Sequence, residues 1–179
     1  MEVILEQMLQ KAQELFGERD QSFEIVGIDC QAQSQPCVFF LESYEKRRIL
    51  IRLTPECSME LNRALFQLSH EVVHCLFPKL WASVLEEGLT TWFSLHFEYG
   101  PYAPLPIERE QYQRAYDLVA PMLAKNPEGI KRYREKDFTL ALLQPQWVQE
   151  QWPDMSLEQC KILCLRFEDY MATFQKPEP

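Results

Sequence analysis

The strongest constraint on the fold is a short stretch of strand-like sequence inside a chain that otherwise has helical periodicity. Residues 48–53 alternate isoleucine and leucine with other side chains, as one half-buried strand would. Two further strand-like runs precede it, at residues 22–29 and 37–41, and short polar segments separate the three. We interpret these runs as a small antiparallel sheet in which the strands follow one another as a meander.

Helical patterns flank this sheet on both sides. An N-terminal helix is predicted over residues 2–16, and Gly17 ends it. A long helix is predicted to begin after the N-cap residue Thr54 and to end at Pro78. Further helices are expected at about 81–97, 107–125, a region after Pro127 to about 143, and 156–175. The expected fold class is therefore α+β, with the small antiparallel sheet packed on helices.

The size and charge of the chain narrow the class of protein. Its 179 residues, 46% of them hydrophobic, suit one compact domain or a domain with a helical extension. A net charge of −9 argues against a nucleic-acid partner, which would need a basic surface. The best basic cluster, at residues 131–134, is interpreted as the solvated face of a helix.

The apolar segments and the N-terminus bear on the compartment. No apolar run approaches the roughly 20 residues that a membrane-spanning helix needs. Glu2 and Glu6 stand where a secretory signal carries positive charge. We therefore expect no membrane partner and a cytoplasmic protein. The six cysteines are then expected to be reduced thiols, with Cys160 and Cys164 buried on one helical face rather than binding a metal.

One segment carries a chemical signature, His70-Glu71-Val72-Val73-His74. An offset of four residues on a helix puts both imidazoles on one face, one turn apart, where they can bind the same Zn²⁺. Glu71 leans toward the same side and can take a proton from a water molecule that the zinc activates. The cofactor expected from this motif is Zn²⁺.

A catalytic zinc site needs a third protein ligand. The metzincin pattern is excluded, because Phe77 and Leu80 occupy the positions where it requires glycine and histidine. The next predicted helix offers Glu86 and Glu87, and the helical wheel puts Glu87 on its polar face and Glu86 at the border. The wheel alone does not choose between them. Gly88 would let this helix approach the first one closely.

Together, the His70–His74 motif and the run Leu85-Glu86-Glu87-Gly88-Leu89-Thr90 resemble the gluzincin zinc metallopeptidases, in particular their short peptidase MA-like members. The resemblance implies that His70, His74 and Glu87 are the zinc ligands and that Glu71 is the general base. It also implies hydrolysis of peptide bonds in a peptide or protein substrate through a zinc-activated water. Thr90 and Val84 depart from the usual family residues.

The family layout matches residues 22–97. We therefore expect a zincin-like catalytic subdomain over residues 1–100 and a helical subdomain over residues 101–179 that closes the cleft. Gluzincins often use a tyrosine or histidine to stabilise the oxyanion. The sequence offers five tyrosines without choosing among them: Tyr99, Tyr102, Tyr112, Tyr116 and Tyr133. His96 shares an apolar helix face and is interpreted as a core histidine.

Two other functions fit the same residues. The chain could be a metallopeptidase-like zinc-binding regulatory or partner-binding protein without general proteolytic activity. It could also be a helical interaction module in which the motif arose by chance. The sequence fixes neither the substrate nor the oligomeric state.

Overall fold

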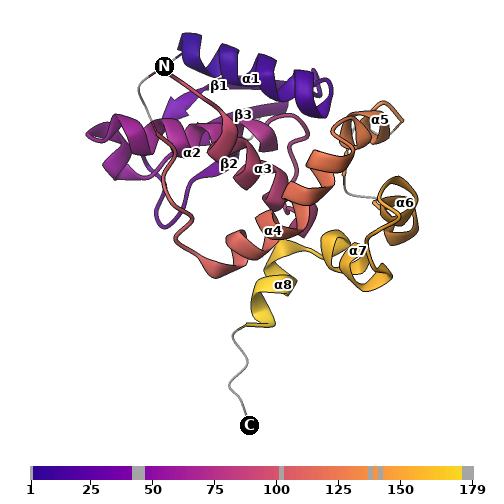
Figure 1. Cartoon of the computed structure of the whole chain (residues 1–179). Helices are drawn as coiled ribbons and strands as arrows, with labels where there is room; N and C mark the ends of the chain where they lie inside the picture. Colours follow the sequence, from indigo (N-terminus) through magenta and orange to yellow (C-terminus); the bar gives the residue numbers. More distant parts are fainter. Residues whose placement is uncertain (1, 42–46, 101–102, 137–138, 141–142, 175–179) are drawn as a thin grey trace.

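The structure is a computed structural model that describes residues 2–41, 47–100, 103–136, 139–140 and 143–174. Within these ranges it is a mixed α+β fold that joins helices to one three-stranded sheet (Figure 1). The first half contains α1 (Glu2–Phe16), β1 (Phe23–Asp29), β2 (Cys37–Leu41), β3 (Arg47–Arg52), the 3-10 helix η1 (Pro55–Ser58), α2 (Leu61–His74) and α3 (Val84–His96). The second half contains α4 (Glu110–Lys125), α5 (Gly129–Arg134), α6 (Pro145–Gln151), α7 (Leu157–Cys164) and α8 (Phe167–Ala172).

The sheet is mixed, so the prediction of an antiparallel meander is wrong. The strand order is β1-β3-β2, with β3 antiparallel to β2 and parallel to β1. The central place of β3 follows from its side chains, because Ile49 and Ile51 are fully buried and the flanking strands are only partly so. A central strand pairs along both of its edges. Here β2 pairs with one edge of β3, and β1 pairs with the other.

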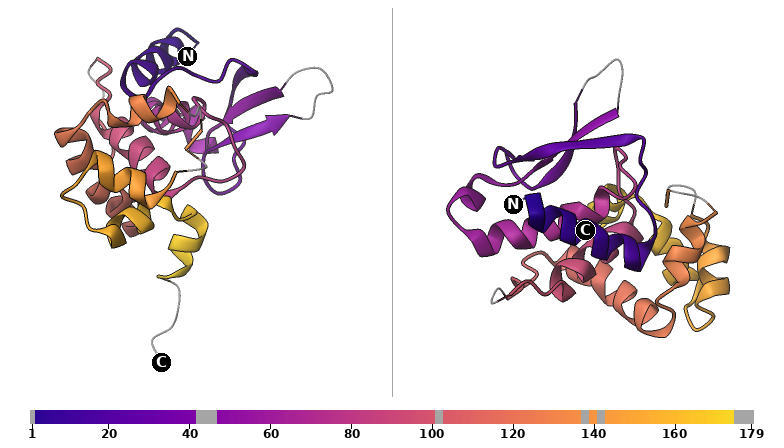
Figure 2. Two further views of the ribbon diagram at one scale, coloured as in Figure 1. Left: turned by 90° about the vertical axis from the view of Figure 1, so that its right-hand side faces the viewer. Right: turned by 90° about the horizontal axis from the view of Figure 1, so that it is seen from above.

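The helices lie in layers beside this sheet. In Figure 2 the sheet occupies one side of the molecule, α1 and α2 lie next to it, and α4 to α7 gather on the opposite side. Gly88 of α3 faces α4, where an added Cβ would meet the Val119 side chain at 2.4 Å and the Ala115 carbonyl at 2.6 Å. The close approach predicted for Gly88 is therefore made to α4 and not to α2.

Several predicted helix bounds change. The segment after Thr54 is a 3-10 turn, and α2 begins only at Leu61 and ends at His74, before Pro78. Of the region from 127 to 143, the residues described as helix are Gly129–Arg134, and α6 was not predicted. The last predicted helix is divided into α7 and α8, because Leu165 and Arg166 are extended and the backbone nitrogen of Phe167 donates to the carbonyl of Ala82.

The basic run at residues 131–134 is not a uniformly solvated face. Arg134 is 2% exposed and donates to the carbonyls of Phe16, Gly17 and Glu18 at the end of α1. It also donates to the carbonyl of Leu76, so this guanidinium joins α5 to the ends of both α1 and α2. One core of buried hydrophobic residues extends from α1 to α8.

The sequence predicts reduced cysteines and no membrane-spanning helix. All six cysteines are free thiols. Cys160 is buried as expected, whereas Cys164 is only partly buried. Across the described part of the chain, no helix is both long and apolar enough to cross a membrane.

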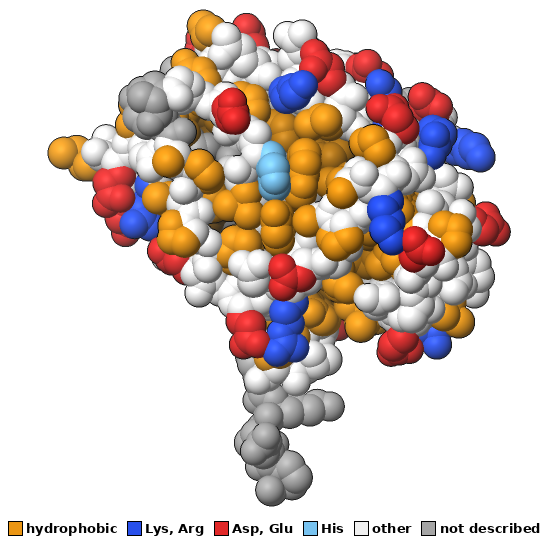
Figure 3. All heavy atoms as spheres, viewed as in Figure 1, with side chains coloured by type: hydrophobic (Ala, Val, Ile, Leu, Met, Phe, Trp, Pro, Cys, Tyr) orange, Lys and Arg blue, Asp and Glu red, His pale blue; other side chains and the backbone are white. Residues whose placement is uncertain are grey.

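On the face drawn in Figure 3, hydrophobic side chains gather over the middle, where α3 and α4 lie in the matching view of Figure 1.

Candidate metal centre

The three motif side chains come from the last turns of α2. An apolar stripe that includes Leu68 and Val72 buries one face of this helix and turns the motif toward α3. The four-residue spacing brings the two imidazoles together, with ring centroids 5.3 Å apart. His70 and His74 remain partly exposed, whereas Glu71 is 2% exposed.

The glutamates come from the first turn of α3. Ser83 is the N-cap of this helix, and its hydroxyl accepts a hydrogen bond from the backbone nitrogen of Glu86 at 3.2 Å. The cap fixes the direction of the first turn, which then faces the last turn of α2. Carboxylates are also favoured at this positive end of the helix. The hydroxyls of Thr90 and Thr91 donate to the carbonyl of Glu87 and tighten the same turn.

The structure brings His70, His74 and Glu87 together. One ligand atom from each lies within 4.8 Å of the others. Nε2 of His70 is 3.3 Å from Oε2 of Glu87, and Nε2 of His74 is 3.6 Å from Oε1. Ligands of a tetrahedral zinc with bonds near 2.0–2.1 Å are about 3.3 Å apart, so these separations suit the ion. Buried Oε2 of Glu87 has no hydrogen bond of good geometry within the described residues.

Glu86 contacts a different nitrogen of His74 than Glu87 does. Its Oε1 lies 2.8 Å from Nδ1 of His74, and its Oε2 lies 2.6 Å from the Lys79 ammonium. A carboxylate on Nδ1 holds that nitrogen as the donor and leaves Nε2 free to bind a metal. Of the two glutamates, therefore, Glu87 sits among the ligand atoms and Glu86 orients a ligand from behind.

Burial and neighbouring charges shift the pKa values of these groups. Burial raises the pKa of Glu71 above the ordinary value, against the opposing charges of His74 and His70. Burial raises the pKa of Glu87 too, but the charge of His74 and the contact with His70 at 3.3 Å outweigh burial and lower that pKa. The pKa values of these two neighbouring carboxyls are therefore shifted in opposite directions.

Burial and neighbouring charges also act in opposite directions on the pKa of His74, and here the charges raise it. Burial lowers its pKa, but the charge of Glu87 and the hydrogen bond to Glu86 outweigh burial and raise the pKa to about 10. Without a metal, His74 is therefore protonated at neutral pH. A metal ion that binds Nε2 has to displace a proton from this ring.

A cleft of about 330 Å³ opens above the motif. His70 and Glu71 lie in it together with Thr91 of α3 and Tyr112 of α4. The Tyr112 ring packs edge-on to the His70 ring at 5.8 Å. Burial, followed by the charges of Glu87 and Glu71, raises the pKa of Tyr112 well above its usual range, so its hydroxyl keeps its proton.

The structure thus separates Tyr112 from the other tyrosines considered. Tyr116 packs against His96, Tyr133 packs against Trp147, and Tyr99 lines a separate small pocket. Tyr102 lies outside the described residues. No local sequence pattern marks Tyr112, because its position depends on how α4 packs across α3. Lys79 was likewise missed, since nothing around it in the sequence indicates a buried cation.

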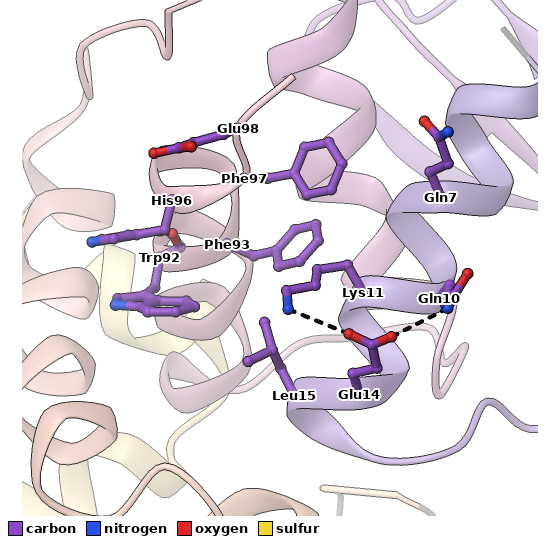
Figure 4. Close-up of a pocket in the computed structure, with 10 residues that line it drawn as sticks. All are labelled: Gln7, Gln10, Lys11, Glu14, Leu15, Trp92, Phe93, His96, Phe97 and Glu98. Carbon is purple, nitrogen blue, oxygen red and sulfur yellow. Dashed lines mark hydrogen bonds and ion pairs between the residues drawn. The ribbon is translucent and has the colours of Figure 1, made fainter. Parts of the chain in front are cut away.

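A second pocket, of about 470 Å³, lies between α1 and α3 (Figure 4). Phe93 and Phe97 point toward α1 in this view, and Lys11 converges on Glu14, 3.3 Å away. His96 also lines this pocket, is exposed and stacks on Trp92, so the interpretation of His96 as a core residue is wrong. The end of α3 reaches the surface, where apolar periodicity no longer implies burial.

Comparisons with protein-family models, with curated proteins and with solved structures found no match to this chain.

Proposed function

We propose that this chain is a zinc-dependent metallopeptidase of the gluzincin type. The observation that carries the proposal is the meeting of His70, His74 and Glu87 beside the buried carboxyl of Glu71, where His70 and Glu71 line a cleft. Two imidazoles, one carboxylate and an open side toward a cleft are the donor set typical of catalytic zinc. The resemblance of the sequence to gluzincins agrees with this assignment.

The chain supplies a base for the reaction. Zinc held by the three ligands would polarise a peptide carbonyl and make water a better nucleophile at neutral pH. Glu71 would take a proton from the attacking water and give it to the leaving amine. Burial raises the pKa of Glu71, and a raised pKa makes its carboxylate a better proton acceptor than an ordinary glutamate.

The chain also supplies a donor for the developing negative charge. Tyr112 lines the same cleft as Glu71 and keeps its proton, so its hydroxyl can donate to the carbonyl oxygen that gains charge in the transition state. Lys79 and Glu86 lie behind His74 and would hold its ring in the binding orientation.

Metal removal tests this function. The purified protein is stripped with a chelator and incubated with a broad peptide library, and cleavage is followed by mass spectrometry before and after one equivalent of zinc is added. We expect no cleavage without metal and restored cleavage with zinc. A protein that binds one zinc tightly but cleaves nothing in the library would instead support the zinc-binding regulatory function. Failure to bind zinc would contradict both.

A further inference from the structure

His70 and Glu71 form the base of the cleft, and the part of the cleft away from them is its upper part. The upper part is built differently from the base. Two connecting segments line it, residues 34–36 before β2 and residues 105–109 before α4, beside residues that follow β3 and residues of α2. A hydrogen bond joins the two segments, from Nη1 of Arg109 to the side-chain oxygen of Gln35 at 3.2 Å. Both residues are exposed and both line the cleft. A group bound against His70 and Glu71 would therefore have the Arg109 guanidinium within the same cavity.

Arg109 is not committed to a carboxylate within the described residues. Its side chain donates to the neutral amide of Gln35, and as the N-cap residue of α4 it makes no side-chain cap hydrogen bond. A guanidinium has five N–H donors in a planar fork, so most of its capacity remains for a ligand. The charge of Arg109 also acts on the Tyr112 hydroxyl, which agrees with a position close to the reacting groups.

Arg63, the other cation that lines the cleft, already has carboxylates as neighbours. Arg63 donates to Glu60 at 2.8 Å, and the charges of Glu108 and Glu56 further raise its pKa. Glu56 and Glu108 line the cleft and would repel an anion, but they flank Arg63. Arg109 is thus the cleft cation whose partner is uncharged.

We propose that Arg109 recognises a substrate carboxylate close to the scissile peptide bond, an inference that rests on the proposed peptidase function. A planar guanidinium matches a carboxylate through two parallel hydrogen bonds. The cleft volume of about 330 Å³ is at the small end of ligand pockets, which accommodates a short peptide end better than a folded chain. The carboxylate is either the C-terminus of the peptide or an acidic side chain next to the cleaved bond.

The test compares three peptide libraries with the zinc-loaded protein. The first has free C-terminal carboxyls and neutral side chains, the second is the same library amidated, and the third is amidated with one glutamate in each peptide. Binding is measured with the Glu71→Gln variant and cleavage with the wild-type sequence. Each measurement is repeated with Arg109→Gln, Arg109→Lys and the control Arg114→Gln, which removes the same charge from an exposed arginine of α4 paired with Glu110.

We expect the first or the third library to be preferred over the second by about 10-fold or more, the value of a charge-assisted hydrogen-bond pair. Arg109→Gln should abolish the preference, Arg109→Lys should keep part of it, and Arg114→Gln should leave it intact. A preference for the first library identifies the C-terminus as the source, and one for the third identifies a side chain.

The outcomes separate this inference from the function on which it rests. Equal cleavage of all three libraries, unchanged by Arg109→Gln, would overturn the carboxylate inference while the peptidase function stood. Binding that depends on Arg109 and on a carboxylate, without any cleavage, would overturn the peptidase function and keep the recognition. Equal binding of acid and amide peptides would overturn the recognition in either case.

Discussion

The base and the upper part of the cleft differ in how their side chains are held. At the base, His70, Glu71 and His74 lie on α2 and Glu87 lies on α3, and each has charged or hydrogen-bonding partners at short distance. The upper part includes two connecting segments that the hydrogen bond between Arg109 and Gln35 joins. Helices packed in a core hold side chains more rigidly than surface segments do.

This difference indicates a division of labour. Chemistry needs fixed geometry, and the α2–α3 pair provides it. Recognition needs access and adjustment, and exposed segments provide both. Changes at the base should therefore abolish metal binding or reaction, whereas changes above it should alter which substrates react.

The largest effect is expected from the proton acceptor. Glu71→Gln keeps the volume of the side chain but accepts no proton, so the rate of peptide hydrolysis should fall by about 10²–10⁴-fold. Zinc content and melting temperature should stay close to those of the wild-type protein, because Glu71 is not one of the three grouped ligands. Steady-state cleavage of one library peptide measures this. Wild-type rates in the variant would disprove the assigned role.

A smaller effect is expected behind the ligands. Glu86→Gln weakens the contact with Nδ1 of His74 and leaves Lys79 without its carboxylate. Zinc affinity should fall by about 10–100-fold, the usual cost of losing such an outer partner. Competition with a chelator of known affinity measures this, and Glu98→Gln, at an exposed glutamate just after α3, is the matched control. Equal loss in both variants would show that Glu86 has no specific orienting role.

The pH dependence of zinc binding tests the raised pKa of His74. Because the pKa of His74 is raised to about 10 in the metal-free protein, zinc competes with a proton throughout the neutral range. Raising the pH removes that proton, so the affinity should rise by about tenfold per unit from pH 6.5 to 8.5. An ordinary histidine, with a pKa near 6.5, would give an affinity that levels off above about pH 7.5. Levelling off in the wild-type protein would contradict the coupling to Glu87 and Glu86.

The smallest effect is expected above the base. Gln35→Ala removes the hydrogen bond between the two cleft walls but leaves the Arg109 guanidinium in place. Since an exposed neutral–charged hydrogen bond contributes little, KM should change by only about 2- to 5-fold, with kcat unchanged. Measuring both constants distinguishes this from a catalytic effect. A large fall in kcat would show that the upper segments position the reacting groups as well.

The sequence predicted the elements that local patterns control. The helix over residues 2–16, the three strands and the motif helix follow from periodicity, capping residues and glycine or proline. The parallel pairing of β1 with β3 could not be predicted, because strand order depends on which strand the core buries most fully. The break before α8 was equally hidden, because it depends on a backbone contact with Ala82, far away in the sequence.

The sequence likewise predicts the parts of the candidate site that local spacing decides, but not the parts that depend on tertiary packing. A four-residue spacing fixes His70 and His74 on one face of a helix, whatever the rest of the fold does. The choice between Glu86 and Glu87 needed the rotation of α3 relative to α2, which the Ser83 cap sets. Lys79 and Tyr112 reach the site only through tertiary packing, and local sequence carries no signal of it.

Zinc content shows directly whether His70, His74 and Glu87 bind a metal ion. We expect one zinc per chain in the wild-type protein, measured by elemental analysis after purification and dialysis. His74→Ala and Glu87→Ala should lose most of it, and Glu86→Ala, next to Glu87 in the same turn of α3, should retain more than Glu87→Ala. Equal zinc content in His74→Ala and the wild-type protein would contradict the assignment of the metal centre.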